Sequence, residues 1–142
     1  GVQEKVFFLG KIDTVASLLA GADLFLLPSD SESFGLSALE ALASGVPVIG
    51  AKAGGLPEVV RDNETGFLCP VGDIDGMSAS ALSVLRDRDR WNAMSSLAAS
   101  DARERFSLGA IVGEYEKFYE YALSLPSTTQ RSERETTTPS TT

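Results

Sequence analysis

Short apolar runs alternate with stretches of helical spacing over the first half of the chain. These runs lie at residues 6–10, 23–28, 46–51 and 65–69, and each has the length of a β-strand. Because they are almost continuously apolar, without regular polar alternation, they predict strands that are covered on both faces, as in a parallel sheet. The sequence therefore predicts four buried strands.

Helices are expected between these runs and over the rest of the chain. Asp13 or Thr14 could cap the first helix, Pro57 opens a short one, and Asp73 or Asp75 could cap the first of the C-terminal helices. The first of these helices is expected to run through residue 21 and the short one to begin at residue 57. The others lie at residues 34–44, 74–86, 88–106 and 108–125. Since strands alternate with helices, the predicted fold class is α/β, with a Rossmann-like parallel sheet flanked by helices.

The C-terminal part of the chain combines aromatic helices with a polar tail. The aromatic residues are Trp91, Phe106, Tyr115, Phe118, Tyr119 and Tyr121, which we interpret as core packing and an amphipathic end helix. Residues 126–142 are rich in Thr, Ser, Arg and Glu and contain no large apolar side chain, so we predict a disordered tail. The expected organisation is one folded domain over residues 1–125, followed by this tail.

Charge and composition exclude several classes of function. Twenty acidic and twelve basic residues give a net charge of −8, so neither nucleic acid nor an anionic membrane is an expected partner. No apolar run approaches the length of a transmembrane helix. One Cys and no His exclude an internal disulfide, the usual Cys/His zinc sites and a Ser-His-Asp triad. This composition fits a reducing, cytoplasmic setting.

The polar loop before the helix predicted at residues 34–44 is the leading candidate site. It follows a predicted parallel strand, and open α/β sheets bind ligands at the carboxyl ends of their strands. The helix start near Phe34, Gly35 and Leu36 offers unpaired amides and a partial positive charge, and Gly35 has no side chain to obstruct an anion. A diphosphate could therefore bind there.

Two carboxylates flank this helix start. Glu32 and Glu40 are eight residues apart, which would bring them to nearly the same face of a continuous helix. Carboxylates repel phosphate but accept hydrogen bonds from vicinal hydroxyls, such as those of a ribose and a hexose. The alternative interpretation is that Glu32 only caps the helix and that Glu40 is an ordinary solvated helix residue.

A pair of glycines after the third predicted strand allows two interpretations. Gly54 and Gly55 could form the tight turn that leads into the helix at Pro57, or they could let the backbone approach a ligand cleft closely. Lys52 and Arg61 are expected on the surface.

The sequence resembles a known family of enzymes. Residues 32–36, 40–41 and 45–49 strongly resemble the E-x7-E signature of retaining GT-B glycosyltransferases, and family 4 is the most similar. Further agreement at residues 8–10, 22–29, 54–60 and 65–68 extends the resemblance over roughly residues 6–125. The resemblance implies the partial C-terminal, nucleotide-sugar-binding domain of a GT-B fold, truncated at its N-terminal end.

The resemblance also implies a role for each matching residue. Glu32 would be the catalytic residue and would bind hydroxyls of the donor sugar, whereas Glu40 would bind those of the ribose. Gly10 and Lys11 would approach the base. The implied donor site comprises Glu32, Ser33, Phe34, Gly35, Leu36, Glu40, Gly10 and Lys11. Neither a metal ion nor another cofactor is expected.

The implied function is transfer of a hexosyl group from a nucleoside diphosphate sugar, with UDP as the expected nucleotide. The acceptor would bind mainly to an N-terminal domain that this chain lacks, so we expect no transfer by the chain alone. In the family, a further strand, a helix, a glycine loop and basic residues precede the part that matches here. Two alternatives remain open, namely a non-catalytic nucleotide-sugar-binding module and a GT-B sugar-nucleotide epimerase.

Overall fold

The computed structural model describes residues 1–125, and the predicted tail at residues 126–142 lies outside them. The elements are η1 (Gln3–Lys5), α1 (Val15–Leu19), β1 (Phe25–Leu27), α2 (Leu36–Ala43), β2 (Val48–Ala51), α3 (Leu56–Val59), β3 (Gly66–Cys69), α4 (Ile74–Leu85), α5 (Arg88–Phe106) and α6 (Leu108–Ser124). The chain divides into one compact unit from Gly1 to Glu104 and a second that begins at Arg105. The extent of the predicted domain stays a prediction.

The three strands form a parallel sheet in the order β1-β2-β3. Phe25 of β1 is opposite Val48 of β2, and Val48 is in turn opposite Gly66 of β3. Helix α2 connects the first two strands and α3 connects the last two, so both connections are βαβ units. The predicted α/β class and the parallel sheet are confirmed.

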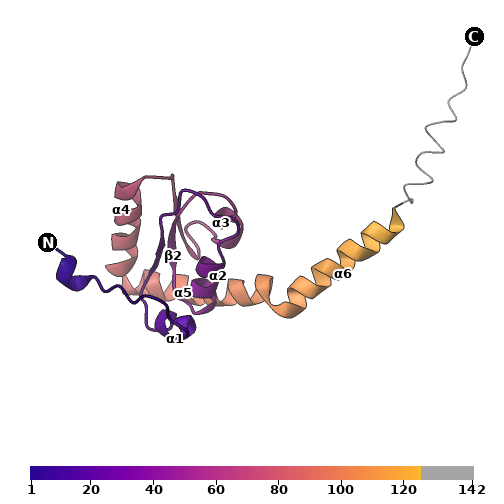
Figure 1. The fold of residues 1–142 in the computed structure, drawn as a ribbon, viewed down its shortest axis with the longest axis horizontal. Helices are drawn as coiled ribbons and strands as arrows, with labels where there is room; N and C mark the ends of the chain where they lie inside the picture. Colours follow the sequence, from indigo (N-terminus) through magenta and orange to yellow (C-terminus); the bar gives the residue numbers. More distant parts are fainter. Residues whose placement is uncertain (126–142) are drawn as a thin grey trace, which may run out of the picture. The chain divides into compact units, whose positions relative to one another are not determined.

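Helices cover both faces of this sheet (Figure 1), with α4 on one side and α2 and α3 on the other. Ile49, Cys69 and Met77 form the hydrophobic core between the sheet and α4. On the opposite side, α2 buries Leu42 completely and α3 buries Leu56. Burial of a side chain of this size contributes about 1.5–3 kcal/mol, so these contacts fix α2 and α3 against the sheet.

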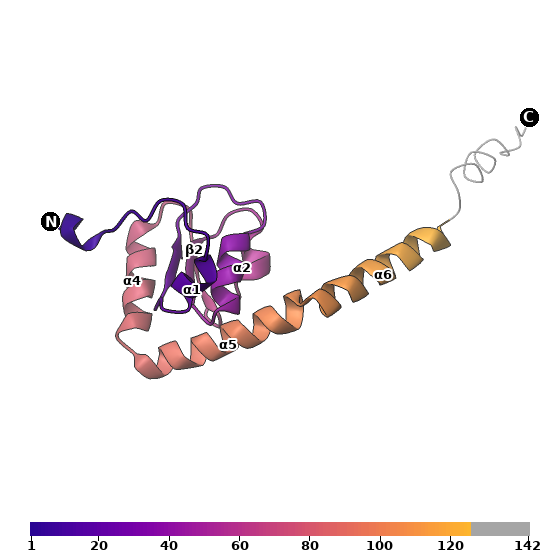
Figure 2. The same ribbon diagram turned by 60° about the horizontal axis from the view of Figure 1, so that its bottom comes forward.

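Helix α5 passes along one end of these layers (Figure 2). Its residues Met94, Ala98 and Ala102 are buried. Near its start, the indole Nε1 of Trp91 donates a hydrogen bond to the carbonyl oxygen of Asp23 at 2.6 Å. This bond ties α5 to the segment that leads into β1.

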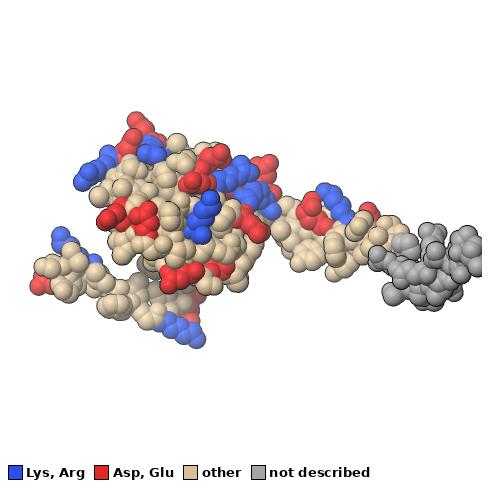
Figure 3. Space-filling view, turned by 90° about the horizontal axis from the view of Figure 1, so that it is seen from above, with Lys and Arg blue, Asp and Glu red and all other residues tan. Residues whose placement is uncertain are grey.

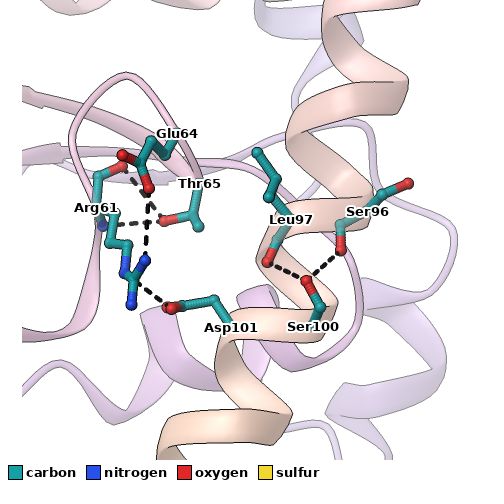
Figure 4. Close-up of polar contacts among 7 residues, drawn as sticks. All are labelled: Arg61, Glu64, Thr65, Ser96, Leu97, Ser100 and Asp101. Atoms are coloured by element: carbon teal, nitrogen blue, oxygen red, sulfur yellow. Dashed lines mark hydrogen bonds and ion pairs between the residues drawn. The ribbon is translucent and has the colours of Figure 1, made fainter.

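An ion pair ties α5 to the loop between α3 and β3 (Figure 4). Arg61 Nε lies 2.8 Å from Oδ1 of Asp101, whose side chain is only 7% exposed. The backbone N–H of Arg61 also donates to Oγ1 of the buried Thr65 at 3.0 Å. Arg61 is half exposed, as predicted for a surface residue, but its guanidinium is engaged with a buried carboxylate.

The strand predicted at residues 6–10 is wrong. These residues form no strand, and the side chains of residues 6–9 are exposed, with Phe8 at 96%. Within the described residues the sheet ends at β1, which pairs only with β2, so the apolar run has no strand beside it. An extended segment needs such a neighbour because its backbone bonds are all made between strands. For the same reason β1 is only partly buried, and Leu26 is 58% exposed.

Several helix boundaries also differ from the prediction. Helix α2 begins at Leu36 because Gly35 adopts a left-handed conformation with φ of +94°, which interrupts the helix before it. Thr14 is the N-cap residue of α1 but makes no side-chain capping bond. Asp73, and not Asp75, caps α4, where its Oδ1 accepts a hydrogen bond from the N–H of Gly76.

Helix α6 exposes its aromatic residues. None of its residues is buried, and Tyr115, Phe118, Tyr119 and Tyr121 are all exposed, so core packing was the wrong interpretation for them. The Lys117 Nζ donates to Oε1 of Glu114 at 2.7 Å, and this bond and the charge of Glu114 raise the pKa of Lys117. No helix in residues 1–125 is both long enough and apolar enough to span a bilayer.

Candidate functional site

Two loops lie next to each other at the carboxyl edge of the sheet. The loop at residues 28–35 follows β1 and leads into α2, and the loop at residues 52–55 follows β2 and leads into α3. Because β1 and β2 are parallel neighbours, both loops leave the sheet at the same edge. This is the edge at which open α/β sheets bind ligands.

Glu32 is hydrogen bonded to the residue that precedes α2. Its Oε1 accepts a hydrogen bond from the backbone N–H of Gly35 at 3.2 Å, and Gly35 is the N-cap residue of the helix. Because this bond ends on the N-cap residue itself, and no side chain caps α2, the choice between a cap and a ligand contact for Glu32 stays a prediction. The amide of Gly35, which is one of those predicted to hold a diphosphate, is therefore bonded to the carboxylate of Glu32.

The expected helical relationship between the two glutamates is wrong. Glu32 lies outside α2, and the left-handed Gly35 separates it from the helix, so the eight-residue spacing does not correspond to turns of one helix. Glu32 is half buried in the loop, whereas Glu40 is exposed on α2. The E-x7-E spacing therefore places Glu32 in the loop and Glu40 on the helix.

Two glycines hold the two loops in backbone contact. The N–H of Gly55 donates to the carbonyl oxygen of Glu32 at 3.0 Å. A Cβ on Gly54 would overlap that same carbonyl oxygen, and a Cβ on Gly55 would lie 2.5 Å from the carbonyl oxygen of Ser33. The sequence suggested a turn or a close approach to a ligand, but neither interpretation includes this contact between loops.

Gly35 is required at the start of α2 for two reasons. Its φ of +94° lies in the left-handed region, and a Cβ there would be 3.0 Å from Cδ1 of the buried Leu56. The beginning of α2 therefore packs directly on the first residue of α3.

The remaining predicted site residues differ in exposure. The side chains of Ser33 and Leu36 are exposed and that of Phe34 is half buried. Gly10 and Lys11 lie in the exposed segment before α1, where a Cβ on Gly10 would meet no atom within 4 Å. Their approach to a bound base stays a prediction.

The charges of the surface do not form one large basic region on the face seen in Figure 3, where Lys and Arg side chains are interspersed with Asp and Glu. Binding of an anion at this site would therefore depend on groups in the site itself. The first turn of α2 supplies them, because the leading N–H groups of a helix have no partner within it and carry a partial positive charge. A helix start and a carboxylate at the carboxyl edge of a parallel sheet are features of the class of α/β domains that bind polar ligands at this edge.

The family of the chain follows from comparison with known sequences. The sequence model described as "Glycosyl transferases group 1" matches residues 1–101, and the chain belongs to this family. It is also 47% identical over 118 residues to N-acetyl-alpha-D-glucosaminyl L-malate synthase of Bacillus anthracis. Residues 8–13 and 54–58 are by themselves similar to those of enzymes that make this product, and this match confirms the similarity.

Solved structures support the same assignment. HepE of Anabaena, solved in complex with UDP, superimposes with a TM-score of 0.77 at 31% identity over 88% of this chain and 34% of its own, and HepE has also been solved with UDP-glucose. The C-terminal domain of the group 1 protein LpcC from Francisella tularensis matches with a TM-score of 0.61 at 27% identity over 71% of this chain and 51% of its own. The predicted fold, part of a GT-B glycosyltransferase, is confirmed.

The match covers a limited part of these proteins. The alignment spans 83% of this chain but only 31% of the Bacillus anthracis relative. This coverage shows the family of the chain, whereas the activity and substrates of a whole protein of this kind can only be proposed.

Proposed function

We propose that this chain is the donor-binding part of a retaining glycosyltransferase that moves a hexosyl group from a UDP-sugar to an acceptor. The observation that carries the proposal is the loop between β1 and α2, where Glu32 and the amides of the helix start lie at the ligand-binding edge of a group 1 glycosyltransferase domain. The HepE complexes with UDP and UDP-glucose support a nucleotide-sugar ligand.

In the proposed site, different groups on and around α2 bind different parts of the ligand. The amides of Phe34, Gly35 and Leu36 hold the diphosphate at the positive end of the helix. As phosphate arrives, Glu32 keeps its backbone position and turns its carboxylate from the amide of Gly35 to hydroxyls of the donor sugar. Glu40, which is exposed on α2, accepts those of the ribose, and Gly10 and Lys11 approach the base.

The proposed chemistry rests on stabilisation of the leaving group. Amides aimed at the diphosphate stabilise the charge that develops as the bond to the sugar breaks. A hydroxyl of the acceptor then attacks the oxocarbenium-like sugar from the face that the diphosphate leaves, and its proton passes to the departing diphosphate. This retains the configuration. We propose that this requires neither a metal ion nor a cofactor, that a further domain holds the acceptor, and that the protein works in the cytoplasm.

Calorimetric titration of the chain with UDP, GDP and their glucose conjugates tests the donor site. We expect UDP to bind, Glu40→Ala to weaken all UDP ligands by about tenfold through loss of a charged hydrogen bond, and Glu32→Ala to weaken only the sugar conjugate. Glu104→Ala, which removes an exposed carboxylate from α5, is the matched control. Equal binding by Glu40→Ala and the parent would contradict the assignment.

The stereochemistry needs the whole protein. Given a UDP-sugar and an acceptor, it should yield products with the configuration of the donor, as measured by NMR of the new glycosidic bond. Inverted products would contradict the retaining mechanism, and binding without any transfer would favour the alternative of a non-catalytic module.

A further inference from the structure

We propose that Gly54 and Gly55 are positioning residues, which set the place of the Glu32 carboxylate through backbone contact. Glu32 belongs to the loop after β1, whereas the glycines belong to the loop after β2. The importance of this contact for transfer rests on the proposed function, in which Glu32 binds the donor sugar. The contact itself can be tested without any ligand.

The contact leaves no room for a side chain. Gly55 donates its N–H to the carbonyl oxygen of Glu32 at 3.0 Å. A Cβ on Gly54 would overlap this oxygen, and a Cβ on Gly55 would lie 2.9 Å from the Cα of Phe34. All of these neighbours are backbone atoms, which cannot rotate away as a side chain does. A methyl group at either position must therefore displace one of the two loops.

The loop of the glycines is held at both of its ends. Lys52 donates its N–H to the carbonyl oxygen of Cys69 at 2.7 Å, which ties the start of the loop to β3. Leu56 and Val59 of α3, which follow the glycines, are 1% and 0% exposed. An added methyl group is therefore expected to move the backbone of Glu32, and with it the carboxylate, away from the N–H of Gly35.

Two substitutions and one control separate this contact from general strain. Gly55 has φ of −80°, which alanine adopts freely, so Gly55→Ala adds only the collision. Gly54→Ala adds the collision together with a left-handed φ of +51°. Gly72 has a left-handed φ of +79° and no atom within 4 Å of an added Cβ, so Gly72→Ala imposes the same backbone strain without touching Glu32.

The first experiment uses NMR on the ligand-free, ¹⁵N-labelled chain. In the parent and in Gly72→Ala, the amide proton of Gly35 should change its chemical shift as acid protonates Glu32, because the two groups are hydrogen bonded. In Gly54→Ala and Gly55→Ala this dependence should fall by at least about half, since the bond weakens steeply with displacement. An unchanged Gly35 titration in both glycine variants would overturn the proposal.

The second experiment joins the contact to ligand binding. Gly55→Ala should weaken UDP-glucose by about tenfold and UDP by less than about twofold, as removal of a charged hydrogen bond would. In a Glu32→Ala background the same substitution should have no further effect on UDP-glucose. Equal losses for both ligands, in either background, would assign the glycines a merely structural role. If the parent binds neither ligand, the proposed function fails, and the Gly35 titration still decides the positioning.

Discussion

Arg61 Nε lies 2.8 Å from Oδ1 of the buried Asp101, so a loop at the end of α3 is held against the middle of α5. We predict that Arg61→Ala lowers the free energy of unfolding by about 1–2 kcal/mol, because it leaves a buried carboxylate without this charge partner. The loss should be smaller than for a fully buried pair, since half of the arginine side chain is exposed. Urea denaturation measures it.

The control uses the other ion pair of the same arginine. Glu64 Oε2 lies 3.6 Å from Arg61 Nη1, and both side chains are more than half exposed. Glu64→Ala should change stability by less than about 0.5 kcal/mol, as exposed pairs usually do. Similar losses of stability for the two variants would show that the pair with Asp101 stabilises the fold no more than the exposed pair does.

The left-handed Gly35 should be more sensitive than another left-handed glycine. We predict that Gly35→Ala costs about 1–2 kcal/mol for the backbone conformation and a further amount for the 3.0 Å approach to Leu56. Gly72→Ala should show only the first cost, because the space around it is open. Thermal unfolding of both variants measures the difference, and equal melting temperatures would contradict the prediction.

Trp91 should contribute through its indole N–H as well as through its ring. The N–H donates to the carbonyl oxygen of Asp23 at 2.6 Å, and the guanidinium of Arg88 lies 4.1 Å from the ring centroid. Trp91→Phe keeps an aromatic ring but removes the donor, so we expect a loss of about 0.5–1.5 kcal/mol in urea denaturation. Arg88→Ala, which removes only the contact with the ring and an exposed ion pair with Asp23, should cost less.

The open edge of the sheet should promote self-association. Leu26 on β1 and Phe8 in the preceding segment are 58% and 96% exposed, and exposed apolar edges pair with other chains. We predict that Leu26→Lys and Phe8→Lys reduce the apparent mass measured by light scattering at high concentration. Leu85→Lys, at a 53% exposed position on α4, is the control and should leave the mass unchanged.

The sequence was sufficient to predict the central sheet but not its edge. The runs that became β1, β2 and β3 and the run at residues 6–10 are similar in length and in apolar character. What distinguishes them is a neighbouring strand, and an apolar pattern contains no information about which strand lies beside it. The helices from α4 onward were predicted closely because their periodicity is long and their caps, such as Asp73, are local.

The candidate site was predicted in place but not in detail. The loop before α2 could be identified from a strand end, a glycine and two glutamates. The sequence allows Glu32 either a role at the helix start or a ligand contact, since residue type alone does not choose between the two. The contact of Gly54 with Glu32 was missed because a glycine shows that space is scarce, but not which distant carbonyl oxygen fills it.

The backbone contact between the two loops also bears on how this surface could change. The path of residues 33–36 is set by glycines and by Leu56 beneath them, whereas the side chains of Ser33 and Leu36 are exposed. Under the proposed function, the backbone framework and the recognition of the ligand are therefore encoded at separate positions. Replacements at Ser33 and Leu36 could accumulate or be selected in the laboratory with little effect on folding, which makes these two positions the natural starting point for redesigning ligand preference on an unchanged scaffold.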